Sequence, residues 1–182
     1  FKKNISSSAT PMVATAKHIK EDHKKAKIAF IGPCIAKKTE ASQPHLKHLI
    51  NFVITFEELM GMLVAQNIDF MSLKDSPKVR DDASTSGRGF ASTGGVAQAI
   101  VNTIHKVEPN YEVKTFAADG LHECMKMLKM AKAGKYDGYL LEGMGCPGGC
   151  IGGAGTLAPI QKSGRELEKY KNASPYFTVQ DN

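Results

Sequence analysis

Short apolar runs alternate along the chain with longer segments in which apolar residues recur every three or four positions. Apolar runs bounded by Gly, Pro or polar residues predict buried strands, and here they lie at 26–31, 51–55, 113–117 and 136–142. The amphipathic segments predict helices, and they lie at 10–24, 55–66, 96–104, 119–134 and 159–171. Because strands and helices alternate, we expect an α/β fold in which parallel sheets are flanked by helices.

Residue types that begin and end helices support these boundaries. Thr10 is predicted as the N-cap of the first helix, and Thr55 with Glu58 matches a capping box at the start of the second. Asp119 and Gly134 are predicted as the N-cap and the C-cap of the fourth helix.

Two segments carry no clear periodic pattern. The segment 67–89 is rich in charged residues, Ser, Asp and Gly, which predicts a long loop, and we expect the chain to divide into two lobes there. The last segment, 172–182, is predicted to be a frayed tail. The chain opens on Phe1 with no element before it, so we expect 1–182 to be one domain fragment of a longer protein.

Composition excludes several classes of partner. The chain has 182 residues, of which 42% are hydrophobic, and no apolar run approaches the ~20 residues that a membrane span needs. No secretory segment is visible, so we expect a cytoplasmic protein without a membrane partner. The net charge is +6, but lysines are scattered and no nucleic-acid-binding signature occurs, so we expect no nucleic acid partner. A basic face could instead receive an acidic electron-carrier protein.

The segment 142–155 is the strongest candidate for chemistry. Seven glycines and one proline surround Cys146 and Cys150 there. A glycine-rich backbone can adopt positive φ or pass close to a bulky group, which is what a loop that binds a metal cluster needs. The alternative interpretation is a flexible loop with incidental cysteines.

A third candidate thiol, Cys34, follows the first predicted strand. Ligands of open α/β sheets lie at the carboxyl ends of strands, so the three thiols could converge there and bind an iron–sulfur cluster or zinc. Zinc is less well supported because no short Cys-Cys or Cys-His pair lies near Cys34. Cys124 lies on the apolar face of a predicted helix and is interpreted as a small buried residue.

Two further groups could assist such a site. Lys37 follows Cys34 by three residues and could offer a positive donor to an anionic ligand, while Glu40 could hold that lysine. A solvated surface helix explains Lys37, Lys38 and Glu40 equally well. The glycine pair Gly94-Gly95 at a predicted helix start exposes backbone N–H groups, which suit an anionic or diatomic ligand.

Two motifs resemble the signatures of the iron-only (diiron) hydrogenases. Residues 32–40, GPCIAKKTE, resemble P-C-x-x-K-x-x-E, and residues 142–153, EGMGCPGGCIGG, resemble E-x-M-x-C-x-G-G-C-x-x-G-G. Residues 4–11 and 93–95 are also similar to that family's core. The resemblance implies the two-lobed catalytic domain of a hydrogenase large subunit, from an anaerobe, that interconverts dihydrogen with protons and electrons. It also implies a 4Fe-4S cluster joined to a diiron centre, together called the H-cluster, with ferredoxin or fused iron–sulfur domains and hydrogenase maturation proteins as partners.

Roles for individual residues follow from the same resemblance. It implies metal ligation by three cysteines, Cys34, Cys146 and Cys150. It implies catalytic or supporting roles at the diiron centre and on the proton path for Lys37, Glu40, Met144 and Ser6. It implies cofactor binding by Thr10, Pro11, Thr93, Gly94, Gly95, Gly148 and Gly149.

The sequence departs from the family pattern in three ways. The first signature, T-S-C-C-P, which supplies the fourth cubane ligand, is not present, so we expect this fragment alone to hold no complete cluster, to be inactive and to have a mobile glycine loop. Gly32 replaces a methionine, which we expect to loosen packing around the diiron centre, and residues 154–156 replace the usual G-Q-P ending. These departures resemble a divergent, sensory branch. The alternatives to an enzyme are therefore a hydrogen or redox sensor with low turnover and an iron–sulfur scaffold protein.

Overall fold

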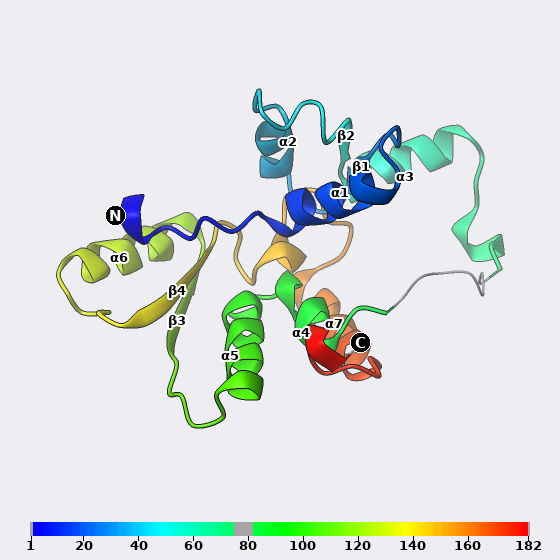
Figure 1. The fold of residues 1–182 in the computed structure, drawn as a ribbon. Helices are drawn as coiled ribbons and strands as arrows, with labels where there is room; N and C mark the ends of the chain where they lie inside the picture. Colours follow the sequence, from blue (N-terminus) through cyan, green and yellow to red (C-terminus); the bar gives the residue numbers. More distant parts are fainter. Residues whose placement is uncertain (1, 75–81, 182) are drawn as a thin grey trace. The chain divides into compact units, whose positions relative to one another are not determined.

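The computed structural model describes residues 2–74 and 82–181, and the chain forms two compact units (Figure 1). Unit 1 contains Phe1–Met71 and Ala154–Leu157, and unit 2 contains Ser72–Gly153 and Ala158–Asn182. Each unit has its own parallel pair of strands with helices beside it, which confirms the predicted α/β class. The first unit boundary falls after Met71, inside the segment 67–89.

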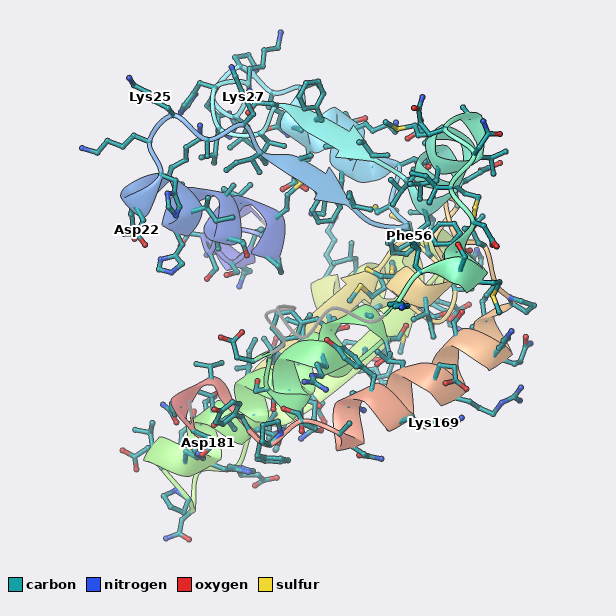
Figure 2. The ribbon with its side chains drawn as sticks, turned by 90° about the vertical axis from the view of Figure 1, so that its right-hand side faces the viewer. Asp22, Lys25, Lys27, Phe56, Lys169 and Asp181 are labelled. Atoms are coloured by element: carbon teal, nitrogen blue, oxygen red, sulfur yellow. The ribbon has the colours of Figure 1, made fainter. Side chains whose placement is uncertain are left out.

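Unit 1 is built around the parallel pair β1–β2, in which Ala29 lies opposite Phe52. Its elements are, in order, a 3-10 turn (Lys2–Asn4), α1 (Pro11–Asp22), β1 (Ala29–Ile31), α2 (Ala36–Ala41), β2 (Phe52–Ile54), α3 (Phe56–Ala65) and a 3-10 turn (Phe70–Ser72) that reaches the boundary. The core lies where α1 packs on the turns that precede β2; its buried residues are Met12, Val13, Ala16, Leu46, Leu49 and Ile50. Lys25 and Lys27, after α1, are exposed, as expected for a solvated lysine surface (Figure 2).

The predicted helix starts of unit 1 are confirmed. The Thr10 hydroxyl accepts a long hydrogen bond from the Val13 N–H, 3.5 Å, at the start of α1. At α3 the capping box is complete, because the Thr55 hydroxyl accepts from the Glu58 N–H and the Glu58 carboxylate accepts from the Thr55 N–H. Local sequence therefore determines where both helices begin.

Unit 2 is built around the parallel pair β3–β4, in which Lys114 lies opposite Tyr139. Its elements are, in order, α4 (Thr85–Arg88), a 3-10 turn (Gly89–Ala91), α5 (Gly95–Val107), β3 (Lys114–Asp119), α6 (Leu121–Lys132), β4 (Tyr139–Met144), a 3-10 turn (Cys150–Gly152), α7 (Ile160–Asn172) and a 3-10 turn (Val179–Asp181). Helices α5 and α6 both contact the two strands (Figure 1). Within residues 2–74 and 82–181, every helix is too short or too polar to span a lipid bilayer.

Two predicted boundaries in unit 2 are wrong. Asp119 does not cap α6; it is the last residue of β3, and Gly120, with φ 75°, makes the turn into the helix without a side-chain cap. The last strand begins at Tyr139 and not at Tyr136, because Tyr136 lies in the turn after α6, where its ring stacks on Phe116 with centroids 4.7 Å apart. At Tyr136 the local apolar pattern extends beyond the strand because the ring packs on Phe116 of β3.

The prediction that the C-terminal tail frays is also wrong. Thr178 is fully buried, and the Tyr176 carbonyl accepts a hydrogen bond from the Thr85 N–H, 2.8 Å, at the start of α4. The Asp181 carboxylate (Figure 2) accepts from the Thr178 N–H and pairs with the Lys106 ammonium on α5. The hydrogen bond from Lys106 is the main reason that the pKa of Asp181 is lowered to about 2. The tail is held because it satisfies donors of two helices.

Candidate functional site

Cys34 lies in unit 1, in the loop between β1 and α2. The Gly32 N–H donates to the Ile54 carbonyl, 3.1 Å, so the ladder between the strands continues to the residue before Pro33. The thiol of Cys34 is half-buried and forms no disulfide. The structure thus places this cysteine directly after the carboxyl end of a strand, as the sequence predicts.

Lys37 and Glu40 form a partly buried ion pair on α2. The Lys37 Nζ lies 2.5 Å from Glu40 Oε2, and the two side chains are 23% and 20% exposed. The Thr10 hydroxyl donates to Glu40 Oε1, 2.6 Å, so one carboxylate holds both groups. In contrast, Lys38 is 41% exposed and pairs with the exposed Glu58. The interpretation as a solvated surface helix therefore fits Lys38 but not Lys37 or Glu40.

The Glu40 carboxylate is stabilised in its ionised form. Burial raises the pKa of Glu40, but the hydrogen bonds from Lys37 and Thr10 together outweigh burial, and the pKa lies below its ordinary value of 4.5. A carboxylate with a lowered pKa stabilises the folded state above its unfolded pKa, and this stabilisation is lost as pH falls through the folded pKa.

We expect Glu40→Gln to lower the free energy of unfolding by about 1–2 kcal/mol at pH 7, because hydrogen bonds to a charged group become neutral ones. The difference from wild type should shrink as pH falls below the ordinary carboxyl pKa of 4.5. Urea unfolding between pH 7 and pH 3.5 measures this. Glu21→Gln, at an exposed position of α1, is the control and should stay within about 0.5 kcal/mol of wild type. A pH-independent difference at Glu40 would contradict the ion pair.

Cys146 and Cys150 lie in unit 2, in the loop that follows β4. The Cys146 carbonyl accepts from the Gly149 N–H, 3.1 Å, and the Cys150 carbonyl accepts from the Gly153 N–H, 3.0 Å. Both cysteines are half-buried and form no disulfide. The loop is thus a pair of tight turns, each anchored on the carbonyl of one cysteine.

This loop packs on, and is hydrogen-bonded to, the backbone just before α5. The Thr93 N–H donates to the Gly148 carbonyl, 3.3 Å, and the Thr93 hydroxyl donates to Asp119, 2.9 Å. Gly149 has φ 90° and ψ −154°, and a Cβ there would lie 2.7 Å from the Thr93 nitrogen and 2.9 Å from the Ala91 carbonyl oxygen. Only glycine permits both this conformation and this approach. The structure therefore brings together the predicted residues Thr93, Gly148 and Gly149.

Glu142 is a site residue that the sequence prediction missed. Its carboxylate, 9% exposed, accepts hydrogen bonds from the Gly94 N–H, 2.8 Å, and the Ala97 N–H, 2.7 Å, in the first turn of α5. The N-cap of this helix, Gly94, has no side chain to satisfy these donors. A signal was present in the sequence, because an acidic residue inside an apolar strand needs buried donors.

The N–H groups of Gly94 and Gly95 already have acceptors within the protein. The interpretation that they are exposed for an anionic or diatomic ligand is therefore wrong. The Gly94 N–H is bonded to Glu142, and the Gly95 N–H donates to the Ser92 carbonyl, 3.0 Å. The negative charge that favours a helix N-terminus is thus supplied by the protein itself. A cofactor-binding role for Gly94 and Gly95 stays a prediction. It would have to depend on atoms other than these two N–H groups.

The remaining predicted residues lie in different surroundings. Met144 is the last residue of β4, and its carbonyl accepts from the Cys124 thiol, 3.3 Å, which fits a packing role for that cysteine. Pro11 is the first residue of α1. Ser6 lies in an exposed stretch before that helix, where its hydroxyl accepts from the Ser8 N–H.

The donor chemistry fits an iron–sulfur cluster in part. The three candidate thiols follow strands of two different sheets, so the prediction that one sheet edge carries all of them is wrong, and their convergence stays a prediction. Among the described residues, no three His, Cys, Asp or Glu side chains are grouped as ligands of one metal ion. Thiolates are the usual ligands of a cubane cluster, which takes four, and this chain supplies three candidates.

The space beside Gly32 is not empty. A Cβ at Gly32 would lie 2.9 Å from the nearest atom of the Phe30 ring, so this ring already occupies the space that a side chain would take. The looser packing that we expect around the diiron centre stays a prediction.

Comparison with known proteins identifies the relatives of this chain. The family model described as "Iron only hydrogenase large subunit, C-terminal domain" matches residues 1–154. The chain is 28% identical to the NADP-reducing hydrogenase subunit HndD of Solidesulfovibrio fructosivorans (82% of this chain, 30% of the relative). It is 28% identical to the periplasmic Fe hydrogenase large subunit of Nitratidesulfovibrio vulgaris (77% and 41%). It is 26% identical to the cytosolic iron-sulfur assembly component 3 of Bos taurus (76% and 37%).

Solved structures agree in fold. A variant of the FeFe-hydrogenase HydA1 from Chlamydomonas reinhardtii superposes with a TM-score of 0.62 at 19% identity, covering 97% of this chain and 61% of that chain. The chain thus spans less than half the length of the curated relatives named above and about three fifths of this structural neighbour.

Proposed function

The chain belongs to the family of C-terminal domains of iron-only hydrogenase large subunits. We therefore propose that it forms the cluster-binding part of a hydrogenase. The full-length protein would interconvert dihydrogen with protons and electrons. The observation that supports this most is the ion pair of Lys37 with Glu40, which is partly buried and lies one turn after Cys34. The ion pair holds the Lys37 ammonium group in one orientation, and an ammonium group has three N–H donors, so it can donate to an anionic ligand as well as to Glu40.

The chain's own residues have defined parts in this proposal. Cys34, Cys146 and Cys150 would supply three thiolates, and a fourth ligand would come from elsewhere in the full-length protein. When bound, the 4Fe-4S and diiron cluster would supply electron transfer and the activation of dihydrogen. Lys37 would donate a hydrogen bond to an anionic ligand of the cluster, and Glu40 would keep its ammonium group oriented.

Partners and compartment belong to the same proposal. Ferredoxin or fused iron–sulfur domains would exchange electrons with the cluster, and hydrogenase maturation proteins would build it. We place the protein in the cytoplasm, where thiols stay reduced. Relatives with cytosolic and periplasmic names both occur, so fractionation of the source cells is the check.

A second candidate function is iron–sulfur cluster assembly. It is favoured by the similarity to the cytosolic iron-sulfur assembly component 3, which matches 76% of this chain, compared with 77% and 82% for the two hydrogenases named above. A sensor with low turnover is a variant of the first proposal.

The test is an infrared spectrum of the full-length protein after anaerobic maturation with the hydrogenase accessory proteins. We expect bands of metal-bound carbon monoxide and cyanide that disappear in Cys150→Ser and persist in Cys124→Ser, the matched control with a packing thiol. A wild-type protein that contains iron and sulfide but shows no such bands would reject the hydrogenase and support assembly. If the bands are present, the rate of hydrogen evolution distinguishes an enzyme from a sensor.

A further inference from the structure

Residues 154–157, which we call the strap, belong to unit 1 although the residues before and after them belong to unit 2. The strap begins four residues after Cys150 and contains the sequence that departs from the family's usual ending. No role for it follows from the cysteine motifs themselves.

The peptide groups of Gly155 hold two parts of unit 1. The Gly155 N–H donates to the Pro33 carbonyl, 2.9 Å, and the Gly155 carbonyl accepts from the Glu57 N–H, 3.3 Å. Pro33 is the residue before Cys34, and Glu57 is the second residue of α3, just after the labelled Phe56 in Figure 2. The Gly155 carbonyl thus satisfies a donor of the first helical turn that the capping box leaves unpaired.

The strap fits this place because Gly155 has no side chain. Gly155 is buried, and a Cβ there would lie 2.5 Å from the Thr55 Cβ, 2.7 Å from the Thr55 Cγ2 and 3.3 Å from the Pro33 carbonyl oxygen. Thr55 is itself 4% exposed and fixed by its capping box, so it cannot move aside without losing those bonds. A larger residue would therefore push the strap off the Pro33 carbonyl.

We propose that Gly155 is a positioning residue for Cys34, the candidate ligand in unit 1. By fixing the Pro33–Cys34 peptide through its N–H group, Gly155 sets the orientation of Cys34. The role in cluster binding rests on the proposed function, whereas the control of Cys34 does not.

The experiment compares Gly155→Ala with the double variant Gly155→Ala/Thr55→Gly, in which the smaller residue 55 makes room for the new Cβ. Thr55→Gly removes both Thr55 atoms that the new Cβ would meet, and glycine is tolerated at an N-cap about as well as threonine. The control is Gly61→Ala in the middle of α3, where a Cβ meets nothing within 4 Å. The readouts are the rate of Cys34 alkylation by iodoacetamide in the metal-free chain, mapped by mass spectrometry, and the iron and sulfide content of the reconstituted full-length protein.

We expect Gly155→Ala to raise the alkylation rate of Cys34 at least about fivefold, since one kcal/mol of lost local stability has this effect on an opening equilibrium. Cys124, in unit 2, should react as in wild type. Gly155→Ala should also lower cluster content, and adding Thr55→Gly should restore both readouts. If Cys34 reacts as in wild type in the single variant, or if the double variant restores nothing, the proposal is overturned. A wild type that binds no cluster rejects the proposed function, and the alkylation rates still decide the role of Gly155.

Discussion

Gly149→Ala is expected to destabilise unit 2 by about 3 kcal/mol and to displace the loop that carries Cys150. Two causes add. A non-glycine residue at φ 90° and ψ −154° is strained by about 1–3 kcal/mol. The new Cβ would also overlap with the backbone at Ala91–Thr93, where overpacking costs a further ~1–3 kcal/mol. For a chain of this size, 3 kcal/mol corresponds to a fall in Tm of about 6–12 °C.

Thermal unfolding and hydrogen exchange at the Thr93 amide measure the effect of Gly149→Ala. The Thr93 N–H donates to the Gly148 carbonyl, so it should lose protection when the loop moves. Gly145→Ala is the matched control in the same loop, because a Cβ there would approach only a Leu121 methyl group, at 3.9 Å. We expect this control to change Tm by less than about 2 °C. Equal effects of the two substitutions would show that the loop is not seated on Thr93.

Glu142→Ala is expected to lower the free energy of unfolding of unit 2 by about 3 kcal/mol. The substitution leaves the N–H groups of Gly94 and Ala97 without their acceptor, and each buried unsatisfied donor costs about 1–3 kcal/mol. Glu142→Gln keeps one carbonyl oxygen as an acceptor and should cost roughly half as much. Because β4 leads directly into the cysteine loop, we also expect weaker cluster retention in both variants.

Urea unfolding of the two Glu142 variants tests this expectation, with Glu166→Gln on the exposed face of α7 as the control. Glu166 pairs with Lys169 in solvent, and exposed pairs contribute less than about 1 kcal/mol. Amide exchange at Ala97 locates the effect, since the start of α5 should open first. An unchanged Ala97 amide in Glu142→Ala would contradict the capping role.

Neighbouring residues determined much of this protein. The capping box of Thr55 and Glu58, the start of α1 at Pro11 and the alternation of strands with helices all follow from side chains within one or two helical turns. The spacing of Cys146 and Cys150 within a glycine-rich stretch likewise marks a candidate metal-binding loop, although the kind of cluster was implied only by the family resemblance. Such features are readable from the sequence because donor and acceptor, or ligand and ligand, lie close together along the chain.

The tertiary structure decided how these pieces are held. Glu142 caps a helix 48 residues away from it in the sequence, Gly155 bonds to the carbonyl of Pro33, and Asp181 pairs with Lys106. The difference between Lys37 and Lys38 is of the same kind, because their neighbours in sequence are alike and only burial separates them. Local propensity carries no information about such contacts, since they depend on which distant donor and acceptor the packed fold brings within hydrogen-bond distance.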